Sequence, residues 1–154
     1  MAVLAAEAPP PGGAPPQAGG PGPADPSPAQ IAVEYRQSLY NVLGHNFMPI
    51  GAMLQGHTPF NGTQAAKHAD RVAYIATMLG DAFPEISKDG KTEAKPEIWT
   101  HRAEFDKKLE GFVADTAALA RLLRTDKTNA VAFKKAAGAV GQDCKGCHDK
   151  FKSE

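Results

Sequence analysis

The chain has 154 residues, only two of them cysteines, and it contains no long apolar run. A helix that crosses a bilayer needs about 20 consecutive apolar residues, so no membrane span is predicted. Lysine and arginine number 17 together, as do aspartate and glutamate, which leaves a formal net charge of zero. This balance argues against nucleic acid or an anionic membrane as the main partner. The length predicts about one domain.

Residues 1–28 lack any apolar periodicity and are dense in proline, glycine and alanine. Proline removes backbone donors, and glycine raises the entropic cost of ordering the chain. We therefore predict a disordered or polyproline-like tail over 1–28, followed by a folded domain over 29–154.

The folded part shows helical periodicity and no alternation with period two, so strands are not expected. Pro49 should kink or break the first helix, and Thr63 is the expected N-cap of the second. In the third and fourth helices apolar residues recur at steps of four and three. The pattern predicts an all-α fold, an antiparallel four-helix bundle. The expected helices cover residues 29–54, 63–79, 96–123 and 128–151.

Both cysteines belong to one short motif, Cys144-Lys-Gly-Cys147-His148. This Cys-x-x-Cys-His pattern is the attachment signature of c-type haem: two thiols form thioethers with the porphyrin, and the histidine ligates iron. On a helix, Cys144, Cys147 and His148 share one face. We therefore expect one covalent haem c per chain, held by Cys144 and Cys147, with His148 as an axial ligand of the iron.

Three other readings of the motif are less well supported. A thioredoxin-like redox pair needs a βαβ context, which the sequence does not show. A structural zinc site needs four nitrogen or sulfur ligands, and there is no second cysteine pair. A disulfide across so short a helical loop would be strained. Because c-type haem is usually attached after export, the haem reading implies a periplasmic protein.

The motif and its surroundings resemble the cytochrome c′ family. The resemblance rests on Ala-Val-Glu-Tyr-Arg-Gln-Ser-Leu-Tyr at 32–40, Pro-Glu-Ile-Trp at 96–99 followed by Phe105, and the haem motif itself. It covers about residues 29–152, so the tail stands outside it. It implies a high-spin haem with an empty sixth position that binds NO and CO, and a homodimer through the first two helices, with Met53 and Ile75 as candidate interface residues.

The resemblance also assigns roles to residues away from the motif. Arg36 matches the arginine that pairs with a haem propionate, and Tyr40 matches the residue over the vacant iron face. Lys152 falls where the family keeps a basic residue, near the proximal pocket. Arg36 and Tyr40 are four apart, so they project from one helix face. Trp99 is expected either to pack near the haem or to cap the third helix.

The remaining candidate ligands have simpler explanations. The four other histidines stand among polar neighbours and are expected on the surface: His45, His57, His68 and His101. Three methionines are expected to fill the core: Met48, Met53 and Met78.

The leading functional hypothesis is a periplasmic protein that binds NO or CO at an open iron, for NO buffering or carriage, with one-electron transfer as an additional capacity. The alternative is an electron-transfer cytochrome with a saturated, low-spin haem. A peroxidase-like enzyme is not favoured, since peroxide cleavage needs a distal acid–base group and only Tyr40 is expected there. The redox partner is not predicted.

Overall fold

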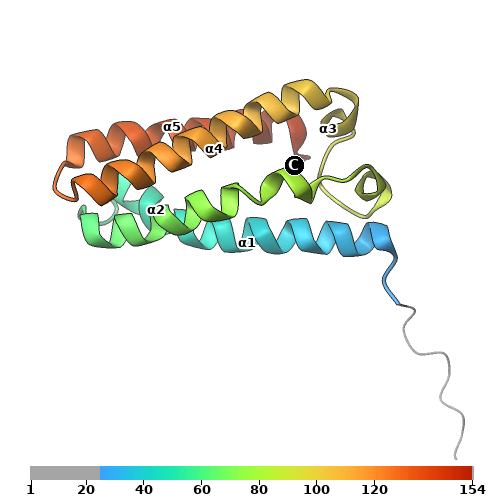
Figure 1. Ribbon diagram of the computed structural model, residues 1–154, viewed down its shortest axis with the longest axis horizontal. Helices are drawn as coiled ribbons and strands as arrows, with labels where there is room; N and C mark the ends of the chain where they lie inside the picture. Colours follow the sequence, from blue (N-terminus) through green and yellow to red (C-terminus); the bar gives the residue numbers. More distant parts are fainter. Residues whose placement is uncertain (1–24, 154) are drawn as a thin grey trace, which may run out of the picture.

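The computed structural model describes residues 25–153, and the predicted tail over 1–28 lies largely outside this range. Figure 1 shows the long helices of the protein running side by side. They are α1 (Pro28–Leu54), α2 (Gly62–Ala76), α4 (Arg102–Thr125) and α5 (Ala130–Phe151). Short connections join α1 to α2 and α4 to α5, so the members of each pair are antiparallel. The predicted all-α, four-helix bundle is confirmed.

A longer connection between α2 and α4 closes one end of the bundle (Figure 1). It contains two 3₁₀ turns, η1 (Leu79–Ala82) and η2 (Glu85–Asp89), and a single helical turn, α3 (Glu97–Thr100). Only an isolated bridge between Ala94 and Lys152 has strand-like pairing within residues 25–153. None of the described helices is long and apolar enough to cross a membrane.

The helix ends follow local chemistry. Ser27 caps α1, where its side chain accepts a hydrogen bond from the backbone of Gln30 at 3.2 Å. Pro28 starts α1 at a position where no backbone donor is needed. The helix then continues through Pro49 to Leu54, so the predicted break at Pro49 is absent. Gly56, with a φ of 77°, turns the chain toward α2.

The second and third predicted helices need corrections. Asn61, not Thr63, caps α2, because its side chain accepts a hydrogen bond from the backbone of Gln64 at 3.0 Å. The third predicted helix is divided at His101, whose φ of −118° and ψ of 43° are not helical. The segment from Pro96 therefore forms one turn, and the long helix α4 begins only at Arg102.

On α4 and α5 the core consists of the predicted apolar repeats, and as a whole it has two parts. The larger part lies among α1, α2, α4 and α5, and the smaller part is aromatic and lies at the end closed by the α2–α4 connection. Met53 is buried as predicted, but Met48 is 69% exposed, so Met48 does not fill the core. His45, His57 and His101 are exposed as predicted, whereas His68 is half-buried against Asn46.

Candidate haem site

A cavity of about 560 Å³ opens at the end of the bundle closed by the α2–α4 connection. Its volume lies within the range of small-molecule and cofactor sites. α1, α4, α5 and the connection all contribute to its walls. Large apolar side chains form much of the lining: Leu43, Leu79, Phe83, Ile98, Phe105, Leu109, Phe112 and Phe151. The polar side chains of this cavity include all but one of the predicted site residues.

The haem motif lies on the last turns of α5, where Cys144, Cys147 and His148 line the cavity. The two cysteines are half-buried, and His148 is exposed at the rim. The preceding part of α5 explains this placement. Phe133, Ala137 and Val140 are buried there at steps of four and three residues, and the same steps place the motif on the inward face of the helix. The structure therefore brings together the three residues that the motif predicts.

The two thiols have the character of buried, protonated groups. Burial, together with the neighbouring Asp143 and Cys147, raises the pKa of Cys144 to about 11. Burial also raises the pKa of the Cys147 thiol. A reactive redox cysteine or a metal-binding thiolate needs a lowered pKa, so this environment does not favour the thioredoxin-like reading. The two cysteines form no disulfide. Within the described residues, no group of three or more potential ligands could hold a metal ion.

Arg36 is buried in the cavity wall, with 3% of its surface exposed. Its guanidinium donates hydrogen bonds to the carbonyl of Ala82 at 3.2 Å, to Ser87 Oγ at 2.9 Å and to Thr92 Oγ1 at 2.9 Å. All three acceptors are neutral, and no carboxylate of residues 25–153 forms an ion pair with it. A buried charge without a counter-ion is costly. Burial accordingly lowers the pKa of Arg36. An anionic group in the cavity would balance this charge.

Tyr40 lies one helical turn after Arg36 and also lines the cavity. Its ring meets the edge of Phe83 with centroids 6.2 Å apart. Burial raises the pKa of the Tyr40 hydroxyl well above its ordinary value, and the nearby Cys147 adds to the effect. The phenol is therefore neutral at physiological pH. Tyr40 presents a bulky apolar ring and a weak hydrogen-bond donor to the cavity.

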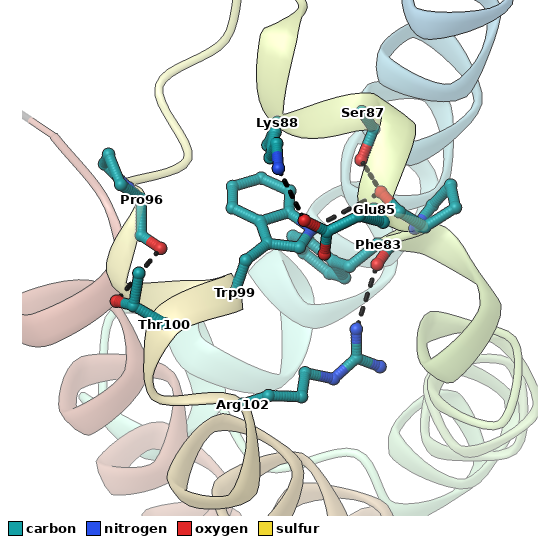
Figure 2. A network of polar contacts seen from close by, with 9 residues as sticks. Phe83, Glu85, Ser87, Lys88, Pro96, Trp99, Thr100 and Arg102 are labelled. Carbon is teal, nitrogen blue, oxygen red and sulfur yellow. Dashed lines mark hydrogen bonds and ion pairs between the residues drawn. The ribbon is translucent and has the colours of Figure 1, made fainter.

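Trp99 is the one predicted site residue that does not line the cavity. Figure 2 shows its indole beside Phe83, at the turn from α3 into α4. The indole N–H donates to the carbonyl of Pro84 at 3.3 Å, and Arg102 donates to the carbonyl of Phe83 at 3.0 Å. Trp99 thus supports the cavity wall from behind Phe83. Direct packing on a porphyrin remains a prediction.

Lys152 lies at the rim, where the end of α5 meets the α2–α4 connection. Its ammonium group forms an ion pair with Glu93 at 3.0 Å. Backbone hydrogen bonds from Lys95 to Phe151, at 2.9 Å, and from Ser153 to Glu93, at 2.8 Å, join the two segments. Lys152 therefore stands at the cavity mouth and close to the motif, as its sequence position predicts.

Asp143 is a cavity residue that sequence reasoning missed. Asp143 directly precedes Cys144 and lies three residues after the buried Val140. Helical spacing along α5 could therefore have placed it near the cavity. One of its carboxyl oxygens is buried and has no hydrogen-bond partner, the only such side-chain atom in the described part of the chain. A buried polar atom of this kind needs an explanation.

The side chains of the cavity fit a covalently bound haem. The apolar walls suit a porphyrin, the two thiols can supply thioethers, and His148 can supply an imidazole nitrogen to iron. Arg36, which has only neutral partners, suits a propionate carboxylate. Cys144, Cys147, His148 and Arg36 are thus the residues that would hold the group.

Comparison with known proteins agrees with this chemistry. The family model described as Cytochrome C′ matches residues 31–152. The chain is 38% identical to the cytochrome c′ of Rubrivivax gelatinosus over 125 residues, which cover 80% of this chain and 95% of the relative. The cytochrome c′ of Shewanella frigidimarina has a similar structure, with a TM-score of 0.75 and 36% identity over 82% of this chain and 97% of that chain.

Two solved structures of cytochrome c′ from Alcaligenes xylosoxidans contain bound gases. A ferrous variant with bound NO has a TM-score of 0.73 and 26% identity, and covers 82% of this chain and 96% of that chain. A variant with bound carbon monoxide has a TM-score of 0.73 and 25% identity, and covers 82% and 97% of the two chains. The family match, the identity to its members, the bundle and the motif together show that this chain belongs to the cytochrome c′ family.

Proposed function

We propose that this protein is a periplasmic haem protein that binds NO and CO at an open iron face, for NO buffering or carriage, with one-electron transfer as an additional capacity. Proteins of this family carry covalently bound haem c. The relatives with bound NO and carbon monoxide support gas binding as the class of activity.

The composition of the cavity wall is the observation that carries the proposal. His148 is the only histidine that lines the cavity, and the lining contains no methionine. Histidine and methionine are the side chains that saturate haem iron in electron-transfer cytochromes. Met48 is exposed on α1, and Met53 is buried in the larger core, so neither lines the site. The chain therefore offers one strong axial ligand, which favours an open iron over the low-spin alternative.

When bound, the haem would supply an iron centre that can bind a small diatomic ligand. His148 would ligate the opposite face, and Cys144 and Cys147 would fix the ring to α5. Arg36 would orient it by pairing with a propionate. Tyr40 would restrict the free face by its bulk, so that small ligands enter only when the ring moves aside.

We propose a binding role in preference to an enzymatic one. Peroxide cleavage requires a distal group that exchanges protons near neutral pH. Burial raises the pKa of Tyr40 far above that range, so its hydroxyl is a poor acid–base catalyst. Attachment of c-type haem, which usually follows export, supports the periplasm as the compartment.

We also propose a homodimer through α1 and α2, with an interface different from the one first expected. Met53 and Ile75 are buried in the core, with 4% and 8% of their surface exposed, so neither can form the interface. Tyr35 and Val42 are half-exposed and seven residues apart on α1, which places them on one face. Tyr74 of α2 is 71% exposed. These three residues are the revised candidates.

Optical spectra of the purified holoprotein test the proposal. The ferric and ferrous forms should be high-spin, and CO and NO should each change the ferrous spectrum. Acid–acetone extraction should leave the haem with the protein. A low-spin resting spectrum that CO does not alter would contradict the open site and make electron transfer the leading function.

A further inference from the structure

Thr92 lines the cavity beside Arg36, yet the proposed function gives it no role. Its hydroxyl oxygen accepts two hydrogen bonds, from Arg36 Nη2 at 2.9 Å and from the backbone N–H of Ala94 at 3.1 Å. A hydroxyl group has two acceptor positions and one O–H donor. Both acceptor positions of Thr92 are therefore occupied. Within residues 25–153 its hydroxyl donates no hydrogen bond, so the hydrogen is free to be donated in the remaining direction.

The other two acceptors of Arg36 differ from Thr92 in this respect. Ser87 Oγ accepts from Arg36 at 2.9 Å and itself donates to the carbonyl of Pro84 at 2.7 Å. Ser87 is fully buried and does not line the cavity. The third acceptor is the carbonyl of Ala82, which has no hydrogen to donate. Of the three partners, Thr92 alone combines a place in the cavity wall with an unused donor.

Arg36 also has unused donors next to Thr92. A guanidinium carries five N–H groups. Nη1 donates to Ala82 and Ser87, and Nη2 donates to Thr92. One hydrogen on Nη2 and the one on Nε thus have no acceptor in the described part of the chain. Because Nη2 lies 2.9 Å from Thr92 Oγ1, its second N–H and the Thr92 O–H are neighbours. A carboxylate, which has two acceptor oxygens, can bind both donors.

The segment that carries Thr92 is held in place from two sides. Toward α1, Gly90 packs so closely that an added Cβ would lie 2.6 Å from Cγ2 of Val33. Toward α5, the backbone N–H of Ser153 donates to the carbonyl of Glu93 at 2.8 Å. Donors that are fixed before a ligand arrives lose little freedom when it binds. The fold therefore presents the Thr92 hydroxyl in a pre-organised position.

The nearest protein carboxylate along the chain does not use this donor. Glu93 follows Thr92 and also lines the cavity, but its side chain pairs with Lys152 at 3.0 Å. The free hydroxyl of Thr92 and the buried charge of Arg36 therefore both lack an anionic partner among residues 25–153. The chemistry of the two groups matches a carboxylate supplied by a molecule in the cavity.

We propose that Thr92 donates a hydrogen bond to the haem carboxylate that pairs with Arg36. The α2–α4 connection then holds the haem together with α1 and α5. Thr92 Oγ1 keeps its two existing hydrogen bonds, and no covalent bond forms or breaks. The inference rests on the covalent haem and on the Arg36–propionate pairing of the proposed function. It does not depend on whether the iron binds a gas.

Resonance Raman spectra of the purified holoprotein test the proposal, because the bending mode of the haem propionates responds to hydrogen bonds at their carboxylates. Thr92→Val keeps the shape of the side chain and removes the hydroxyl group, so this mode should shift to lower frequency. Thr92→Ser keeps the hydroxyl group and should retain the wild-type frequency. An unshifted mode in Thr92→Val would overturn the proposal.

Ser87→Ala is the matched control, because it removes a hydroxyl group that accepts from the same arginine but does not line the cavity. This variant should be less stable and should leave the propionate mode unchanged. An equal shift in Ser87→Ala and Thr92→Val would mean that the effect passes through Arg36, which would overturn direct donation by Thr92. The CO spectrum of the same samples reports separately on the open iron site.

A crystal structure of the wild-type holoprotein decides the question if Thr92→Val yields no holoprotein. Thr92 Oγ1 should lie within about 3.0 Å of an oxygen of the carboxylate that Arg36 binds. A propionate that contacts Arg36 but lies beyond hydrogen-bond range of Thr92 would overturn the inference and leave the proposed function intact. A propionate that contacts neither residue would overturn both the inference and the role of Arg36.

Discussion

The guanidinium of Arg36 lies over the ring of Phe83, 4.8 Å from its centroid, and so joins α1 to the connection that closes the cavity. Phe83 in turn contacts Phe105 of α4, with centroids 4.7 Å apart. The same arginine donates to Ala82, Ser87 and Thr92 of that connection. Arg36 therefore has two roles: it organises the connection, and it presents a positive charge to the cavity.

Arg36→Lys should destabilise the holoprotein even though it keeps the charge. A lysine cannot reproduce the fork that reaches three acceptors or lie flat over Phe83. Hydrogen bonds from charged groups each contribute about 1.5–3 kcal/mol, so we expect a loss of about 2–4 kcal/mol in the free energy of unfolding. Guanidinium denaturation followed by circular dichroism measures this loss. Arg124→Lys, which alters a surface ion pair with Asp70, is the control and should change stability by less than about 1 kcal/mol.

Gly62→Ala should destabilise the far end of the bundle. A Cβ atom at position 62 would lie 1.7 Å from the backbone oxygen of Lys127, so the α4–α5 turn would have to move. Overpacking of this kind costs about 1–3 kcal/mol. Gly111→Ala is the matched control, because nothing lies within 4 Å of its added Cβ in α4. In that helix interior the same substitution should stabilise by about 0.5–1 kcal/mol. Equal effects of the two substitutions on thermal unfolding would contradict this account.

His68 should make the bundle less stable as pH falls below about 6.5. Burial lowers the pKa of His68, and the positive charges of Arg71 and Lys67 lower it further. The folded state therefore favours the neutral ring, whereas the unfolded chain binds the proton more readily, so stability is lost as pH falls from the ordinary histidine pKa toward the lowered one. Urea denaturation at several pH values measures the effect. His68→Gln should flatten the profile, and His57→Gln, in the exposed α1–α2 turn, should leave it unchanged.

Val42→Glu should convert a dimer to a monomer. Val42 is 51% exposed on α1 and shares a face with Tyr35, so a charge there would be buried without a partner in the proposed interface. Sedimentation velocity at micromolar concentration measures the change. Val131→Glu, at an 81% exposed site at the start of α5, is the control and should stay dimeric. A monomeric wild-type protein would refute the dimer itself.

Helical periodicity was sufficient to predict the bundle, because the apolar face of each helix can be recognised from the spacing of residues within that helix alone. Phe105, Phe112, Leu119 and Leu123 are buried on α4 as that spacing requires. The division of the third helix at His101 was not predictable in the same way. It depends on contacts between distant segments, such as those of Trp99 with Pro84 and of Arg102 with Phe83. These contacts fix the turn from α3 into α4, as Figure 2 shows.

The site residues could be predicted where they belong to a recognisable sequence motif. They could be predicted less well where their position depends on packing between distant segments. Cys144, Cys147 and His148 follow from one local pattern, and Arg36 and Tyr40 follow from the family resemblance; all five line the cavity. Trp99 does not line the cavity but packs against Phe83, which does, and the sequence does not show this arrangement; its packing near the haem stays a prediction. The unpartnered oxygen of Asp143 is a property of packing between α4 and α5, so composition alone could not identify it.

Tyr40→Ala is the decisive test of the gate at the cavity. If the ring restricts the free iron face, its removal should increase the CO association rate by at least tenfold, since the ligand no longer has to displace the ring. The haem should remain high-spin, because Tyr40 acts by bulk and not as a ligand. Flash photolysis of the CO complex measures the rate in wild type and variant.

Ile31→Ala is the control for this test, because Ile31 is exposed on the same helix, does not line the cavity and is not among the proposed interface residues. Its CO association rate should equal that of the wild type. An unchanged rate in Tyr40→Ala would mean that another side chain of the wall, such as Leu43, guards the iron. Tyr40→Phe separates bulk from hydrogen bonding: it keeps the ring and removes the hydroxyl, so a purely steric gate predicts a rate close to that of the wild type. A large change in Tyr40→Phe would instead assign the effect to the hydroxyl group.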